Sequence, residues 1–127
     1  GLAVVNALLD HGLVARAKAQ GDKLMNTLRA EFGQHPHVGD IRGRGLFLGI
    51  ELVANRETKA PFDPSRKVAG KIKAAAFEAG LICYPMSGTI DGKSGDHVLL
   101  APPFIILDDQ IDELVAKLSG AIQTALA

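Results

Sequence analysis

Apolar residues recur along this chain with two different periods, and their alternation limits the folds that the chain can adopt. Helical spacing predicts helices over residues 2–11, 13–32 and 64–79, and from Asp108 or Asp109 onward. Short β-prone runs predict strands over residues 38–42, 46–53, 81–84 and 97–101. So few strands beside long helices favour an α+β domain, with a small mixed or antiparallel three- to four-stranded sheet and helices packed on one face.

The composition excludes several classes of function. The 127 residues suit one domain, and the 14 basic and 14 acidic residues cancel. Nucleic-acid binding needs a clustered excess of Lys and Arg, so we expect no nucleic-acid partner. No apolar run is long enough to span a membrane, and no secretory signal is recognisable. Cys83 has no second cysteine to pair with, which suits a reducing compartment, and we expect a cytoplasmic protein.

The N-terminal segment resembles the middle of a helix more than its start. It reads GLAVVNALL over residues 1–9, with neither an initiator Met nor a Ser, Thr, Asp or Asn cap before the apolar positions. We therefore expect that an upstream portion precedes Gly1 and that residues 1–127 are one domain of a longer protein.

Two glycine-containing motifs look like nucleotide-binding signatures, but neither has the glycine spacing or the following helix that such a signature requires. Residues 43–45 are Gly-Arg-Gly and Gly49 follows, but the third glycine is one position late for a dinucleotide fingerprint. Residues 92–94 are Gly-Lys-Ser, yet the upstream glycine of a P-loop would fall at Ser87. Each motif leads into a predicted strand, where both signatures require a helix to receive the phosphate. We interpret the two motifs as turns.

Candidate metal ligands and nucleophiles are sparse. His35 and His37 flank Pro36, but no third ligand lies nearby at metal-binding spacing, so we interpret both as solvated loop residues. Cys83 falls in a predicted strand and suits a small, buried, apolar position. No serine elbow of the hydrolase type is present. From its residues alone, the chain contains no complete active site.

Four stretches, in order along the chain, resemble the C-terminal small domain of class III aminotransferases, enzymes of fold type I that depend on pyridoxal phosphate. The stretches are residues 40–52 (DIRGRGLFLGIEL), 58–62 (TKAPF), 79–85 (AGLICYP) and 95–106 (GDHVLLAPPFII). The first is similar to the strand that opens the small-domain sheet of that family. The last is similar to its final strand and double-proline exit. The resemblance covers essentially the whole chain.

This resemblance implies part of an enzyme that moves an amino group from an amine or ω-amino acid to an oxo acid. In the family the large domain supplies the catalytic lysine and most contacts to the cofactor phosphate. None of the lysines here lies in the matching motif. The resemblance thus implies that the parent enzyme binds pyridoxal 5'-phosphate, while this fragment binds none and is inactive alone. The implied partners are its own large domain and the second subunit of a homodimer.

The resemblance also nominates residues on the substrate side. Some family members carry an arginine where this chain has Leu99, and others carry one in the loop where this chain has Lys93. Lys93 is therefore a candidate cation for a substrate carboxylate, although lysine lacks the bidentate fork of arginine. Tyr84, Pro85 and Met86 are candidates for lining the substrate, or else for packing against the large domain.

Two pairs of alternatives stay open at the level of sequence. Arg42 and Arg44 flank a glycine turn, where they serve in a structural ion pair or domain contact, or else act electrostatically near an active site. The chain is either part of an aminotransferase or a stand-alone α/β binding or interaction module without catalysis. Its uncapped, apolar first helix favours the former, because a self-contained domain does not need such a helix.

Overall fold

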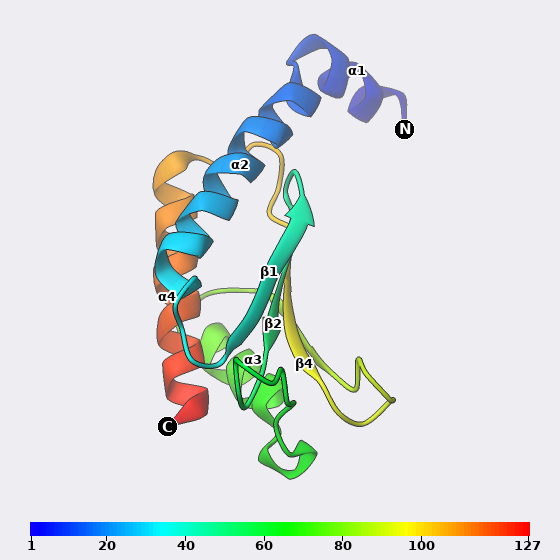
Figure 1. Ribbon diagram of the computed structural model, residues 1–127. Coiled ribbons are helices and arrows are strands. Elements are labelled where there is room, and N and C mark those ends of the chain that lie inside the picture. The colour runs from blue at the N-terminus through cyan, green and yellow to red at the C-terminus, as the bar shows by residue number, and fades with distance from the viewer.

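A computed structural model describes all 127 residues of the chain (Figure 1). The helices are α1 (Leu2–Asp10), α2 (Leu13–Phe32), α3 (Val68–Glu78) and α4 (Asp108–Leu126), with a 3-10 turn η1 at Pro64–Arg66. The strands are β1 (Val38–Arg44), β2 (Phe47–Leu52), β3 (Tyr84–Ser87) and β4 (Asp96–Leu100). No helix combines the length and the apolar character that a membrane crossing requires.

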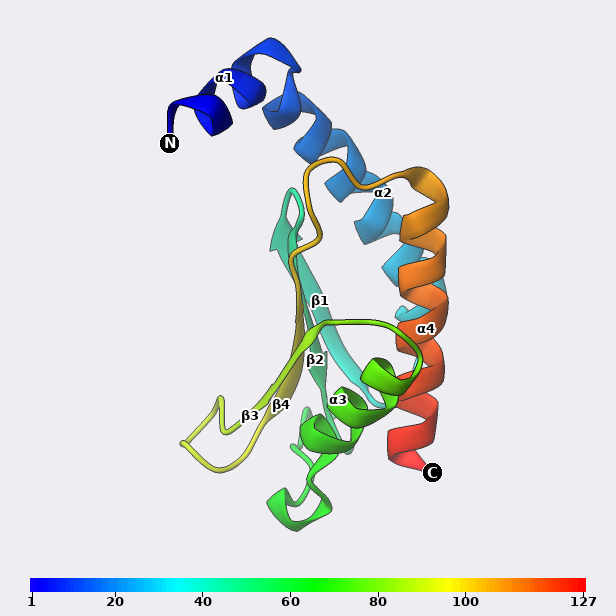
Figure 2. The same ribbon diagram turned by 180° about the vertical axis from the view of Figure 1, so that it is seen from behind.

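The four strands form one sheet in the order β1-β2-β4-β3, and every neighbouring pair is antiparallel. Helices α2, α3 and α4 lie on one side of the sheet, and no helix covers the other side (Figure 2). The predicted fold class is therefore confirmed: a small α+β domain with helices on one face of the sheet.

The hydrophobic core lies between the sheet and these three helices. Alternate residues of β2 point into it, and Leu48, Ile50 and Leu52 are each at most 2% exposed. Apolar residues at helical spacing on α4 face them, with Ile111 and Leu118 fully enclosed. Because side chains alternate along a strand, burial of one set leaves the other set on an open face.

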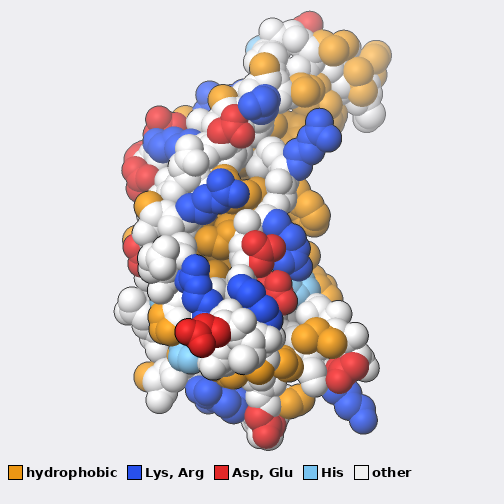
Figure 3. All heavy atoms as spheres, in the orientation of Figure 1, with side chains coloured by type: hydrophobic (Ala, Val, Ile, Leu, Met, Phe, Trp, Pro, Cys, Tyr) orange, Lys and Arg blue, Asp and Glu red, His pale blue; other side chains and the backbone are white.

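Helix α1 projects from the rest of the molecule beyond the start of α2 (Figure 1). None of its nine residues is buried, and Leu2 and Leu9 remain 75% and 73% exposed. Gly12 joins α1 to α2 in the left-handed conformation, at a φ of 59°, which glycine adopts readily where a helix ends. The apolar side chains of α1 therefore gather at one end of the molecular surface (Figure 3).

The third helix starts four residues later than predicted. Asp63 accepts a hydrogen bond from the Ser65 amide at 2.8 Å, but it caps only the short turn η1. Lys67 then adopts a left-handed conformation, at a φ of 50°, and α3 begins at Val68. The Asp63-Pro64 pair therefore starts only the single turn η1, which the left-handed Lys67 separates from α3.

The third strand also starts later than predicted, at Tyr84 instead of Leu81. The chain leaves α3 through a Schellman motif, in which the Gly80 amide donates to the Phe77 carbonyl at 3.0 Å and the Leu81 amide donates to the Ala76 carbonyl at 2.8 Å. These bonds engage Leu81 with the helix end, so the residues after it return to the sheet before pairing begins.

Helix α2 meets the β1–β2 turn at a contact that only glycine allows. A Cβ atom added at Gly21 would lie 2.2 Å from the carbonyl oxygen of Gly45. Gly45 itself has a φ of 55°, which side chains disfavour. Gly45 thus allows close packing of a helix on the hairpin, a contact that the turn interpretation did not include. Gly43 falls within β1, where an added Cβ atom would lie 2.2 Å from the Phe47 carbonyl oxygen of β2.

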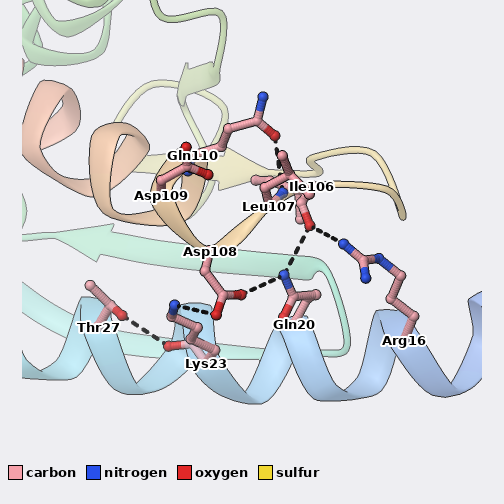
Figure 4. A network of polar contacts seen from close by, with 9 residues as sticks. All are labelled: Arg16, Gln20, Lys23, Thr27, Ile106, Leu107, Asp108, Asp109 and Gln110. Carbon is pink, nitrogen blue, oxygen red and sulfur yellow. Dashed lines mark hydrogen bonds and ion pairs between the residues drawn. The ribbon is translucent and has the colours of Figure 1, made fainter.

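A polar cluster fastens α2 to the segment between β4 and α4 (Figure 4). Arg16 donates through Nε to the Phe104 carbonyl at 3.1 Å, and through Nη2 to the carbonyls of Ile105 at 3.4 Å and Ile106 at 2.8 Å. One guanidinium thereby satisfies three successive carbonyl groups that precede the helix. Arg16 ties the exit of the last strand to a helix that lies 88 residues earlier in the chain.

Two further residues of α2 continue this connection toward the start of α4. Gln20 donates to the Ile106 carbonyl at 2.9 Å and to the Asp108 carboxylate at 3.0 Å. Lys23 forms an ion pair with Asp108 at 3.0 Å, and these two donors hold the pKa of Asp108 below its usual value. An acidic residue in the first turn also suits the positive end of the helix dipole.

Candidate functional site

The open face of the sheet is where candidate functional side chains gather. The strand register places four residues in a row across the sheet: Arg42, Gly49, Leu99 and Tyr84. A second row beside it consists of Asp40, Glu51, His97 and Met86. The face is therefore polar toward β1 and apolar toward β3.

An ion cluster occupies the β1 side of this face. Nη1 of Arg42 donates to the Asp40 carboxylate at 2.9 Å and to the Glu51 carboxylate at 3.0 Å. These hydrogen bonds raise the pKa of Arg42 above its ordinary value. The Arg42 side chain is 65% exposed, so the cluster contributes little to stability. The structural ion pair proposed for Arg42 is thus present in the structure.

Arg44 behaves differently, because no carboxylate lies within ion-pair distance of it. It lines a groove of about 930 Å³ between helices α1 and α2 and the β1–β2 turn. Leu9, Val14 and Met25 supply apolar walls to the same groove. Arg42 therefore belongs to the ion cluster on the open face, while Arg44 lines the groove beside α1 and α2.

The three neighbouring candidates on β3 do not share one face. Tyr84 pairs with Leu99 and Met86 pairs with His97, so both lie in the rows of the open face. Pro85 pairs with Val98, a fully buried residue, and alternation directs it toward the helices. Tyr84 is 61% exposed and Met86 37% exposed, so only these two of the three are available to a ligand on the open face.

Lys93 lies in the loop of residues 88–95, which joins β3 to β4 at the end of the molecule away from α1 (Figures 1 and 2). Oδ1 of Asp91 accepts hydrogen bonds from the amides of Lys93 at 2.9 Å and Ser94 at 2.6 Å. The same bonds, that of Ser94 foremost, lower the pKa of Asp91. The amine of Lys93 is exposed and has no ion-pair partner.

The start of this loop turns toward the open face and forms a shallow groove there. The groove has a volume of about 350 Å³. Thr89 and Ile90 of the loop line it together with Phe47, His97 and Leu99. One side of the groove is apolar, and the ion cluster of Arg42 forms the other. It is the only one of the larger cavities that combines the open sheet face with the loop.

Asp96 was not singled out from the sequence, and it is the one buried carboxylate. Its side chain is 5% exposed, and Oδ1 accepts a hydrogen bond from the Ala69 amide in the first turn of α3 at 3.3 Å. Burial raises its pKa, and the bond from Ala69 acts in the opposite direction. The sequence predicts a strand directly after Asp96, but it does not indicate that Asp96 bonds to a residue 27 positions earlier.

The two loop histidines are not freely solvated, which corrects the sequence interpretation. The rings of His35 and His37 lie 6.0 Å apart, and the His37 ring lies 5.3 Å from that of Phe62. Partial burial lowers the pKa of His35. The His37 ring lies beside Phe62, which is remote in sequence, and the His35 ring lies beside Phe32, so both rings lie against core residues. No group of three potential metal ligands forms here or elsewhere in the chain.

Residues that could hold a phosphate-bearing cofactor are not assembled in this chain. A lysine that binds such a group covalently normally lies in a desolvated pocket with anion-binding backbone amides close by. All eight lysines here are exposed or partly exposed, and Lys18, Lys23 and Lys117 form surface ion pairs. The residues present do not fit a pyridoxal phosphate site.

Comparisons with known proteins agree with the described fold. The family model "Aminotransferase class-III" matches residues 1–122. An uncharacterised aminotransferase of Schizosaccharomyces pombe is 49% identical over 126 residues, which are 99% of this chain and 28% of that protein. The chain therefore spans little more than a quarter of that relative.

Two solved structures superimpose on the chain closely. An (S)-enantioselective omega-transaminase from Thermomicrobium roseum gives a TM-score of 0.87 at 28% identity, over 99% of this chain and 26% of that one. A pyridoxal-phosphate-bound aminotransferase mutant from Vibrio fluvialis gives 0.86 at 28% identity, over 98% and 26%. With a family model that matches nearly its whole length, the chain belongs to the class III aminotransferases.

Proposed function

We propose that the chain is the C-terminal small domain of a pyridoxal-phosphate-dependent aminotransferase that moves an amino group from an amine or ω-amino acid to an oxo acid. One observation carries this proposal: the family model matches residues 1–122, yet the chain spans only 28% of its S. pombe relative. The omega-transaminase of Thermomicrobium roseum among the structural neighbours supports an amine or ω-amino acid as donor.

The surfaces left uncovered by the fold support a larger parent. Helix α1 buries none of its residues, and the open sheet face has no helix over it. We assign both surfaces to contacts with the large domain, within a cytoplasmic homodimer. Exposed apolar surface of this kind marks an interaction site in most soluble proteins.

The cofactor belongs, on this proposal, to the remainder of the parent. Pyridoxal phosphate supplies an electron sink when bound, and the Vibrio fluvialis neighbour carries it. We assign the covalent lysine to the large domain, because the lysines of this chain lie at its surface. The isolated chain is accordingly inactive.

Three residues of this chain are proposed to face the substrate. The amine of Lys93 is free to attract a carboxylate, while Tyr84 and Met86 offer an apolar surface on the open face. Pro85 lies on the covered face, so we assign it to strand packing and not to the substrate contact that the resemblance nominates.

The test compares the full-length protein with the 127-residue chain. We expect the full-length protein to bind pyridoxal phosphate stoichiometrically, to become covalently labelled after borohydride reduction, and to transfer an amino group from an ω-amino acid to an oxo acid. We expect no labelling of the 127-residue chain under the same conditions. A reduced adduct on any residue of the isolated chain would contradict the proposal.

Lys93 provides a test of the substrate side. Substitution Lys93→Ala in the full-length enzyme should raise KM for the oxo acid about tenfold, since one charge-assisted hydrogen bond is lost. The matched control is Lys71→Ala, which removes an exposed lysine from α3 and should leave KM unchanged. Equal KM values for the two variants would remove Lys93 from the substrate site.

A further inference from the structure

We propose that Asp96 is a positioning residue that holds the loop of residues 88–95 in place by capping α3 from the neighbouring strand. The capping contact is independent of function, while the consequence for substrate binding rests on the role proposed above for Lys93.

Helix α3 lacks a cap of its own. Lys67 occupies the N-cap position in a left-handed conformation and makes no side-chain capping bond. Asp63, the nearest upstream carboxylate, is occupied by the amide of Ser65. The first amides of a helix have no partner within the helix, so one must come from elsewhere. Oδ1 of Asp96 supplies it to Ala69, in a buried setting.

Asp96 is also the anchor of the loop. It is the first residue of β4, and it pairs with Ser87 on β3 and with Leu52 on β2. The loop starts directly after Ser87 and ends directly before Asp96. A shift of Asp96 therefore moves both ends of the loop together.

The loop is stiff enough to pass on such a shift. The Thr89 amide donates to the Gly95 carbonyl at 3.4 Å, and the Ile90 amide donates to the Ser94 carbonyl at 3.0 Å. Gly95 is buried at a φ of 93°, and an added Cβ atom there would lie 2.8 Å from the side chains of both Thr89 and Ile90. The base of the loop is consequently packed against the residue next to Asp96, with Lys93 near the tip.

The first arm of the test measures loop order by amide hydrogen exchange. In Asp96→Ala we expect the amides of residues 89–95 and of the first turn of α3 to exchange about fivefold faster, the factor that corresponds to one lost helix cap. The separate variant Asp96→Asn keeps an accepting oxygen and should retain the original protection of these amides. Asp63→Ala, which removes a cap from η1 alone, should leave the loop unchanged.

The second arm measures kinetics in the full-length enzyme. Asp96→Ala should raise KM for the oxo acid about fivefold, again the factor of one lost cap, with kcat nearly unchanged, and Asp96→Asn should return KM to its original value. If the alanine variant does not fold, Asp96→Ser replaces it, since a shorter hydroxyl acceptor should give a smaller increase in exchange and KM.

The outcomes separate the two proposals. Unchanged exchange of the loop in the Asp96→Ala variant overturns the positioning role, whatever the kinetics show. Failure of Asp96→Asn to restore protection overturns it as well. Faster exchange with an unchanged KM in both Asp96→Ala and Lys93→Ala supports the capping role and overturns the substrate role proposed for the loop.

Discussion

At the scale of single residues, long-range polar contacts decide how the connections of this fold are held. Arg16 reaches three successive carbonyls ahead of α4, and Asp96 reaches the first turn of α3. Both contacts satisfy backbone groups that local sequence leaves without partners. Neither could be foreseen, because each side chain is separated from its partner by 27 or more residues.

Arg16 offers a direct measure of such a contact. Arg16→Ala should lower the free energy of unfolding by about 1–2 kcal/mol, because several carbonyls lose a charged donor. Lys18→Ala on the same helix removes only an exposed ion pair with Asp22 and should change it by less than about 0.5 kcal/mol. Urea denaturation of the two variants measures the two losses, and equal losses would count against a stabilising role of the Arg16 contacts.

Cys83 should respond to pH as a thiol that is partly withdrawn from water. Burial raises its pKa, so at pH 8 less thiolate is present in the folded chain than in the unfolded one. Alkylation by iodoacetamide should be slower in buffer than in urea. The raised pKa also makes the free energy of unfolding depend on pH. The stabilisation from the buried neutral thiol is complete below the pKa of the unfolded thiol and is lost as the pH rises through the folded pKa. Equal alkylation rates would contradict it.

At the scale of elements, the two kinds of helix glycine should respond to alanine in opposite ways. Gly21→Ala should lower the free energy of unfolding by about 1–3 kcal/mol, since the new methyl group collides with the Gly45 carbonyl. Gly120→Ala on α4 meets nothing within 4 Å and should raise it by about 0.5–1 kcal/mol through better helix propensity. Thermal unfolding of both variants measures these changes. Free energies of unfolding that change in the same direction would contradict the close contact between Gly21 and Gly45.

Element boundaries show what local sequence controls. The bounds predicted for α2, residues 13–32, are confirmed, because apolar periodicity and flanking glycines agree there. The start predicted for α3 is wrong. The Asp63-Pro64 pair is a typical helix start, but nothing in the sequence indicates that Lys67 adopts the left-handed conformation that ends the first turn. The three-residue shift of β3 accompanies the Schellman exit, which keeps the amides of Gly80 and Leu81 bonded to the end of α3.

At the scale of the whole molecule, the candidate site was only partly predictable. The resemblance identified the stretch at residues 84–86 and Lys93, but the two faces of a strand depend on its register, so the separation of Pro85 from Tyr84 appears only in the structure. The contact of Asp96 with Ala69, on which the proposed ordering of the loop around Lys93 rests, is tertiary and also appears only in the structure. Sequence thus indicates the family and nominates candidate residues, while packing determines which of these side chains share one face.

The exposed apolar residues of α1 lead to a prediction for the chain in isolation. Val4 is 64% exposed and Leu9 73%, so we expect self-association that increases with concentration in sedimentation experiments. The double variant Val4→Lys, Leu9→Lys should associate less, with an unchanged unfolding midpoint because neither residue is buried. An unsubstituted 127-residue chain that remains strictly monomeric would contradict this expectation.

The margins of the sheet limit what form that association can take. β3, at one margin, has only four residues and carries Pro85, which has no amide hydrogen to donate. β1, at the other margin, has an irregular register between Val38 and Asp40, and the Lys59 ammonium already occupies the Gly39 carbonyl. Neither edge strand therefore presents an uninterrupted row of free backbone groups with which a strand of another molecule could pair. Aggregates of this chain should therefore be amorphous or oligomeric and fail to stain with amyloid dyes.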